Sequence, residues 1–101
     1  MKTIPNTNPQ LVILAVEANF GDDEIVTREL PIVAWLVDEE VLRAPDAIPV
    51  SIARVPLRWA ILDRDTGMAY GTPNWFAARA YAVEHLADLA RADAARDAAA
   101  A

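Results

Sequence analysis

The stretch 11-LVILAVEANF-20 decides whether the first half of the chain is built from strands or from helices. Apolar residues occupy every second position of the stretch, while polar Glu17 and Asn19 interrupt the other face; the apolar set is Val12, Leu14, Val16, Ala18 and Phe20. A period of two is typical of a strand with one buried face, and β-branched residues favour strands. We therefore predict a strand over residues 11–20.

A helix over the same residues is the alternative that the sequence leaves open. Asn8 is a good helix N-cap, Pro9 fits the first helical turn, and Gly21 suits a helix end. The choice between the two depends on the β-branched residues at positions 12, 13 and 16, which favour the strand.

The residues that follow extend the strand pattern to about Tyr70. The segment 21-GDDE-24 is typical of a hairpin turn, and Pro31 marks a break in the return strand because proline cannot donate to a ladder. The apolar run 32-IVAWLV-37 indicates the middle of a sheet. A return strand, a charged connection with a single helical turn, and two further strands are expected over residues 25–37, 38–47, 48–55 and 57–63.

The triplet Asp65-Thr66-Gly67 raises the question of a dimeric aspartic protease. In such enzymes the triplet follows an apolar strand, which delivers each aspartate without its water to a shared pair of carboxylates. Here charged Asp63 and Arg64 precede the triplet, and a helix rather than further strands follows it. We interpret the triplet as a hairpin turn.

The last quarter of the chain has a helical pattern. Thr72 is a suitable N-cap and Pro73 a suitable first residue, and apolar residues recur at helical spacing; they are Trp75, Ala78, Ala82, Leu86 and Leu89. Residues 91–101 contain only Ala among Arg and Asp, so we expect an exposed helix end that frays. Residues 1–9 are expected to form a flexible lead.

Together these elements predict a single α+β domain over residues 1–101. Its four-stranded, mostly antiparallel sheet is followed by one long C-terminal helix packed on one face. With 101 residues and 54% apolar composition, one core can form without disulfides, and the chain has no cysteine. The apolar run after residue 10 is too short to span a bilayer and no cleavage site follows it, so a cytoplasmic protein without membrane contact is expected.

The net charge of −6 belongs entirely to residues 1–50, because residues 51–101 are neutral. An acidic chain repels phosphate at long range, so nucleic-acid binding is disfavoured and association with a basic partner is favoured. Two acidic groups form the predicted partner-binding residues: Asp22, Asp23, Glu24, Asp38, Glu39 and Glu40. Their alternative interpretation is that of ordinary solvated loops.

Three tryptophans and three arginines complete the candidate residues. Trp59 and Trp75 are expected in the core between sheet and helix, whereas Trp35 with Val33 is expected on an open sheet face suited to a partner or to homodimerisation. The arginines are the alternative nucleic-acid contacts, if they project from the face opposite the helix; they are Arg54, Arg58 and Arg64. Otherwise they pair with acids across the strands.

Catalytic chemistry has few residues to use. Ser51 and His85 are the sole serine and histidine, and Asp63 and Asp65 lack the later ligands of a calcium loop. No catalytic residue, metal or cofactor is predicted.

The sequence therefore predicts a small acidic, non-enzymatic module that blocks a basic, nucleic-acid-handling protein. Immunity proteins, antitoxins and phage anti-defence inhibitors such as anti-CRISPR proteins share this profile of size and charge. The alternative is a DNA-binding accessory domain that uses the three arginines.

Overall fold

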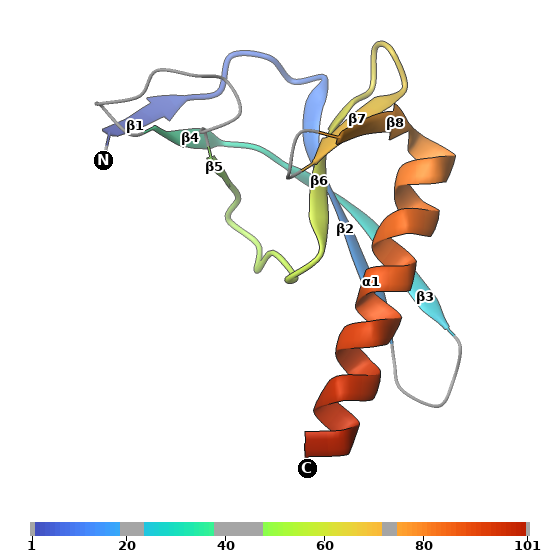
Figure 1. The fold of residues 1–101 in the computed structure, drawn as a ribbon. Coiled ribbons are helices and arrows are strands. Elements are labelled where there is room, and N and C mark those ends of the chain that lie inside the picture. The colour runs from blue at the N-terminus through green and yellow to red at the C-terminus, as the bar shows by residue number, and fades with distance from the viewer. Residues whose placement is uncertain (1, 19–23, 38–47, 72–74, 101) are drawn as a thin grey trace.

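The computed structural model describes residues 2–18, 24–37, 48–71 and 75–100. Within them the chain forms eight strands and one helix. The helix lies along one face of the larger of two sheets, and the smaller sheet lies to one side, away from the helix (Figure 1). The elements are β1 (Lys2–Pro5), β2 (Leu11–Ala18), β3 (Ile25–Pro31), β4 (Ala34–Val37), β5 (Ile48–Val50), β6 (Trp59–Asp63), β7 (Met68–Gly71), β8 (Trp75–Ala78) and α1 (Arg79–Ala100). The α+β class is confirmed, but the prediction of one four-stranded sheet is wrong in detail.

The larger sheet has the strand order β3-β2-β6-β7-β8, and all its pairs are antiparallel. Strand β2 pairs on one side with β3, where Val12 lies opposite Pro31, and on the other with β6, where Val12 lies opposite Leu62. Residues 12–16 are all buried. The strand predicted from the opening stretch is confirmed over Leu11–Ala18, and the helical alternative is wrong there.

The smaller sheet has the order β1-β4-β5 and includes residues that were predicted to be a flexible lead. Strand β1 pairs with β4, so that Ile4 lies opposite Trp35. Strand β1 precedes β2 in the chain, and β4 follows β3. Because β2 pairs with β3, β1 lies alongside β4 and pairs with it. β1 and β2 thus form one arm of a long bent hairpin, and β3 and β4 form the other.

The expected return strand over residues 25–37 is interrupted at Ile32 and Val33, directly after Pro31. Its two halves belong to different sheets, and β4 is the central strand of the smaller one. The strand expected over residues 48–55 is limited to β5, and residues 51–58 cross to the larger sheet without regular structure.

The helix begins at Arg79, later than predicted, because residues 75–78 form strand β8 against β7. The Arg79 N–H donates to the carbonyl of Gly67 at 3.0 Å and so continues the β7–β8 pairing into the helix start. The expected capping residues, Thr72 and Pro73, lie outside the described residues. The predicted hairpin turn is present at residues 64–67, where Gly67 adopts a positive φ of 75°.

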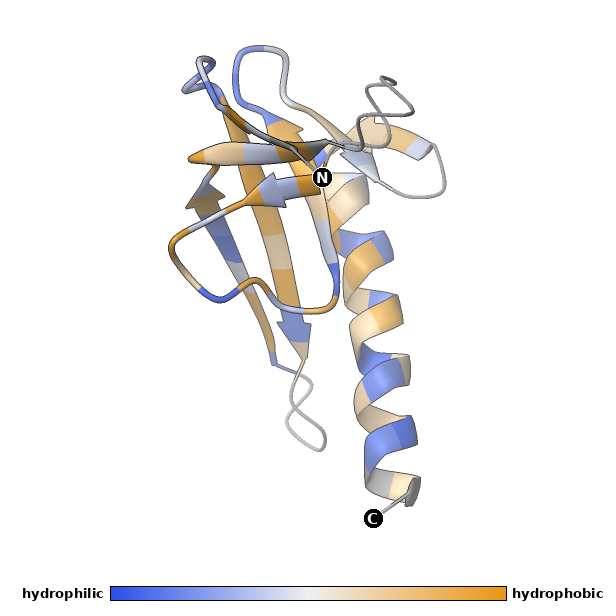
Figure 2. Ribbon diagram, turned by 90° about the vertical axis from the view of Figure 1, so that its left-hand side faces the viewer, coloured by the Kyte–Doolittle hydropathy of each residue, from blue (hydrophilic) through white to orange (hydrophobic). Residues whose placement is uncertain are grey.

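The larger sheet separates two cores, and α1 lies along one of its faces (Figures 1 and 2). Between this sheet and α1 lies the first core; it consists of Val12, Leu14, Val16, Ala60, Leu62, Ala69, Ala82, Leu86 and Ala87, with Ile25, Trp75 and Val83 beside them. On the opposite face lies the second; it consists of Ile13, Ala15 and Ile32, with Leu11, Leu30, Trp35, Val55, Trp59 and Ile61 beside them.

Trp75 and Trp59 lie on opposite faces of the larger sheet. Trp75 packs against the first core, as expected. Trp59 packs in the second core, so its predicted place between sheet and helix is wrong. The sequence could not decide which face of β6 carries Trp59, because both faces bear apolar residues. Ala60 and Leu62 pack in the first core, whereas Trp59 and Ile61 pack in the second.

Candidate functional site

Arg58 forms a two-pronged ion pair with Asp93 of α1. Its Nε donates to Asp93 Oδ2 at 2.6 Å and its Nη2 donates to Asp93 Oδ1 at 2.9 Å. The Arg58 hydrogen bonds hold the pKa of the Asp93 carboxyl below its usual value, and those same bonds raise the pKa of Arg58. The Arg58–Asp93 pair links the second half of α1 to the residue that directly precedes β6.

Glu29 accepts hydrogen bonds from two arginines at once. Arg64 Nε lies 3.1 Å from Glu29 Oε1, and Arg79 Nη2 lies 3.3 Å from Glu29 Oε2. Glu29 is on β3, at one edge of the larger sheet, while Arg79 follows β8 at the other edge. The sheet is therefore coiled enough that the Glu29 carboxylate on its first strand binds Arg79, which directly follows its last strand.

The three candidate arginines do not share an open face. Arg58 and Arg64 both reach partners on the side of the sheet that α1 covers, because Asp93 belongs to α1 and Glu29 lies opposite first-core Leu14. Arg54 precedes Arg58 in the same irregular segment, is exposed, and forms no ion pair with another described residue. The expected common face opposite the helix is thus wrong for Arg58 and Arg64, which instead form ion pairs.

Trp35 and Val33 do not form the expected open apolar face either. Trp35 is half-buried, packs against the second core, and donates its indole Nε1–H to Asn6 Oδ1 at 3.2 Å. Val33 lies in the break before β4 and is 44% exposed. The second face of the larger sheet is covered by Trp35 where the sequence suggested that it was free.

Asn6 organises the place where both arms of the long hairpin change sheets. Its backbone N–H donates to Val33 O at 3.1 Å, and its side-chain Nδ2 donates to Ile32 O at 2.8 Å and to Asn8 O at 3.0 Å. Its Oδ1 accepts from Trp35 Nε1 and from the N–H of Asn8. All polar groups of this side chain are therefore used to hold the bend.

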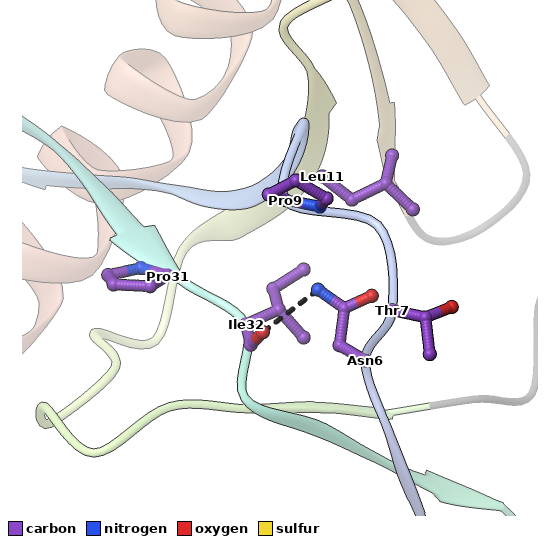
Figure 3. A pocket seen from close by; sticks show the side chains of 6 residues that line it. All are labelled: Asn6, Thr7, Pro9, Leu11, Pro31 and Ile32. Atoms are coloured by element: carbon purple, nitrogen blue, oxygen red, sulfur yellow. Dashed lines mark hydrogen bonds between the residues drawn. The ribbon is translucent and has the colours of Figure 1, made fainter.

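A shallow pocket of about 240 Å³ lies beside this bend (Figure 3). Its lining residues come from both arms of the hairpin: Asn6, Thr7, Pro9, Leu11, Pro31 and Ile32. Since the Asn6 amide is already bonded to the backbone, the pocket offers a ligand little beyond the Thr7 hydroxyl and apolar surface. We do not assign it a binding role.

Most of the predicted acidic binding residues fall on segments outside the described residues. Asp22, Asp23, Asp38, Glu39 and Glu40 belong to residues 19–23 and 38–47, whereas Glu24 is described and exposed. The described residues hold eight basic and nine acidic side chains, and the remaining residues hold one basic and six acidic ones. Nearly all of the surplus negative charge is therefore in the β2–β3 and β4–β5 connections.

These two connections leave from opposite ends of the long bent hairpin. Ala18 and Ile25 form the end pair of the β2–β3 ladder, whereas the β4–β5 connection departs after Val37, which pairs with Lys2 at the other end. The end of the β2–β3 hairpin lies at the same end of the molecule as the C-terminus of α1 (Figures 1 and 2).

An exposed aromatic pair is the feature that the sequence reasoning missed. Tyr70 of β7 and Phe76 of β8 lie directly opposite each other, with ring centroids 5.6 Å apart and planes inclined by 23°. Tyr70 is 43% exposed and Phe76 60% exposed. The alternation of buried Ala69 with exposed Tyr70 is the pattern of a strand. Assignment of residues from 73 onward to a helix leaves this strand without its partner β8, so the pairing of Tyr70 with Phe76 is not predicted.

Within the described residues no group of three or more His, Asp or Glu side chains could hold a metal ion. His85 packs edge-on against the Trp75 ring at 5.1 Å, and the Ser51 hydroxyl accepts the N–H of Ala53 at 3.3 Å. Each of these two polar side chains thus has a local structural contact. In the described part of the chain, α1 is not apolar enough to cross a membrane.

Comparison with protein-family models, with curated proteins and with solved structures finds no match for this chain. Evidence for function therefore comes from the distribution of charge and of exposed apolar side chains over the molecule.

Proposed function

We propose that this protein is a non-enzymatic binding module that occupies a basic surface of a nucleic-acid-handling protein, in the manner of an inhibitor or antitoxin. The observation that carries the proposal is the separation of charge. The described part of the molecule is nearly neutral, and five of its arginines are in ion pairs with Glu29, Asp88 or Asp93. The surplus acid is concentrated in two connections, at residues 19–23 and 38–47.

This distribution favours a basic partner for a physical reason. Acids that are paired within a fold contribute little field outside it, whereas a local surplus of carboxylates attracts cationic surfaces and accelerates encounter with them. Arginine side chains of a nucleic-acid groove are suited to carboxylates, because the guanidinium binds them through two parallel hydrogen bonds. Duplex DNA is disfavoured as a partner by the same surplus.

The test is capture from the source cell by the immobilised protein, with identification of the retained proteins by mass. One variant neutralises the first connection (Asp22→Asn, Asp23→Asn and Glu24→Gln), and a second neutralises the other (Asp38→Asn, Glu39→Gln and Glu40→Gln). The matched control removes the same amount of charge elsewhere, at Glu17→Gln, Asp65→Asn and Asp97→Asn, which form no ion pair with other described residues.

The expected result is a basic, nucleic-acid-handling protein that the wild type and the control retain and that at least one connection variant loses. Equal loss in the control would show that net charge alone matters and would contradict the assignment of the site. Tight binding to a DNA duplex that weakens steeply with salt would contradict the proposal itself and favour the arginine-based alternative.

A further inference from the structure

The second face of the larger sheet carries an apolar row that continues beyond its cover. The row consists of residues that lie opposite one another on successive strands: Leu30, Ile13, Ile61, Tyr70 and Phe76. The first three pack in the second core, beneath Trp35, Val55 and their neighbours. The last two are exposed, so the cover ends between β6 and β7.

One acid lies on the same face beside the exposed end of this row. Asp63 of β6 lies opposite Met68 of β7, which puts it diagonally adjacent to Tyr70, at a Cα separation of about 7–8 Å. Its Oδ1 accepts the N–H of Asp65 at 2.9 Å, and it forms no ion pair with another described residue. Asp63, Met68, Tyr70 and Phe76 together are here called the aromatic patch.

The chemistry of the aromatic patch selects one kind of side chain. Aromatic faces attract cations, and a guanidinium can stack on a ring while its edge hydrogen-bonds to a carboxylate. An ammonium group lacks the planar surface and the paired donors for both contacts at once. Strands β7 and β8 contribute no charged side chain, and the flanking Arg64 and Arg79 pair with Glu29 on the side of the first core, so Asp63 supplies the charge of the patch.

We propose that the aromatic patch docks an arginine-bearing segment of the basic partner, with the guanidinium on Tyr70 and Phe76 and against the Asp63 carboxylate. This inference rests on the proposed function, because it names a contact within the same complex. It adds a contact that selects arginine to the long-range attraction of the acidic connections.

The docking can be tested without the partner, by NMR titration with three blocked tripeptides, Ac-Gly-Arg-Gly-NH2, Ac-Gly-Lys-Gly-NH2 and Ac-Gly-Glu-Gly-NH2. The arginine peptide should shift the signals of Met68, Tyr70 and Phe76 in a saturable way, the lysine peptide severalfold more weakly, and the glutamate peptide not at all. Equal shifts with arginine and lysine, confined to residues 19–24 and 38–47, would overturn the proposal.

Two variants and a control sharpen this titration. Asp63→Asn keeps the acceptor for the Asp65 N–H but removes the charge, and should weaken arginine binding severalfold. Tyr70→Ser with Phe76→Ser should abolish the shifts. Tyr81→Ser removes a ring that is 70% exposed on α1, which covers the opposite face, and should change nothing.

The capture experiment separates failure of this inference from failure of the proposed function. Retention of a basic partner that depends on the acidic connections but not on Tyr70 and Phe76 would leave the function standing and overturn the docking. Binding of the arginine peptide at the aromatic patch, without capture of any basic partner, would show that the patch selects arginine and would contradict the proposed function. A dimer in sedimentation that dissociates when Tyr70 and Phe76 are replaced would make the patch a self-interface and would also overturn the docking.

Discussion

Asn6 shows how much of a fold can depend on one small polar side chain. It satisfies backbone groups on both arms of the long hairpin at the point where neither sheet provides their partners. It also fixes the orientation of Trp35, which covers the second core. Nothing in the local sequence marks Asn6 as different from Asn8, because its partners at residues 32–35 are distant along the chain.

Replacement of Asn6 should reveal this role. We expect Asn6→Ala to lower the free energy of unfolding by about 1–3 kcal/mol, since it leaves half-buried groups without hydrogen bonds. Asn6→Asp keeps the acceptor for Trp35 but places a carboxylate oxygen against Ile32 O, and should be no better than alanine. Urea unfolding followed by tryptophan fluorescence measures both.

Asn8→Ala is the control for this series, because Asn8 makes an exposed hydrogen bond, to the Gln10 N–H. Its cost should be smaller than that of Asn6→Ala. Equal costs for the two alanine variants would contradict the assigned role of Asn6.

Two glycines are required for different reasons. Gly67 has a positive φ but open space around a Cβ, so Gly67→Ala should cost about 1 kcal/mol from backbone strain alone, and Gly67→Asn less. At Gly71 a Cβ would collide with the Trp75 indole, so Gly71→Ala should cost more than Gly67→Ala. Thermal melting should show a shift of roughly 4–8 °C per kcal/mol for a domain of this size; the reverse order would show that the Trp75 ring moves away easily.

At the level of elements, the sequence predicted β2 and the turn at residues 64–67 well, because each has a strong local signal. Alternation of apolar residues marks β2, and an aspartate with a glycine marks the turn. Strand β8 was missed because residues 75–78 have helix-compatible spacing and good caps before them. Pairing with β7 overrides this local preference, and the resulting Tyr70–Phe76 pair could not be predicted without it.

The positions of the predicted acidic residues could be found from the sequence, whereas the surroundings of the arginines and of Trp35 could not. Composition alone located the charge in two segments of the chain, and the structure adds where those segments attach to the strands. The arginine and Trp35 predictions depended on which sheet face is covered. That depends on a second sheet formed by distant residues, which periodicity does not reveal.

Beyond the core contacts of α1, the Arg58–Asp93 ion pair holds the second half of the helix, as the Arg79–Glu29 pair holds its first residue. Ala90 is the last helix residue in the buried set, and Asp93 one turn later binds Arg58. Because the pKa of Asp93 is lowered in the folded protein, its stabilising contribution is complete above the usual aspartate pKa and is lost as the pH falls through the lowered value.

Asp93→Asn should therefore destabilise the protein at neutral pH, and the difference from wild type should shrink as the pH falls below about 4. Urea unfolding at a series of pH values measures this difference. Asp97→Asn, at a helix position without an ion pair among the described residues, should show no such pH dependence. Amide exchange should also accelerate after Ala90 in Asp93→Asn; an unchanged profile would show that Arg58 does not hold the helix end.

On the scale of the whole molecule, the two cores should unfold together because they share the same strands. Ile13 and Leu14 are consecutive, each completely buried, and belong to different cores. Ile13→Ala and Leu14→Ala should each cost about 2–5 kcal/mol. Far-UV circular dichroism and the fluorescence of the tryptophans should give one coincident transition for both variants; separate transitions would show that the small sheet is an independent unit.

Helix α1 follows the eight strands of the described residues, and this order has a consequence for how the chain is made. A ribosome completes both arms of the hairpin and the β6–β8 strands before it adds the residues that cover Val12, Leu14 and Leu62. Until then the nascent sheet presents one bare apolar side, a condition that invites aggregation and chaperone binding. Translation that stops at Ala78 should therefore yield a product that proteases degrade faster than the chain that includes α1.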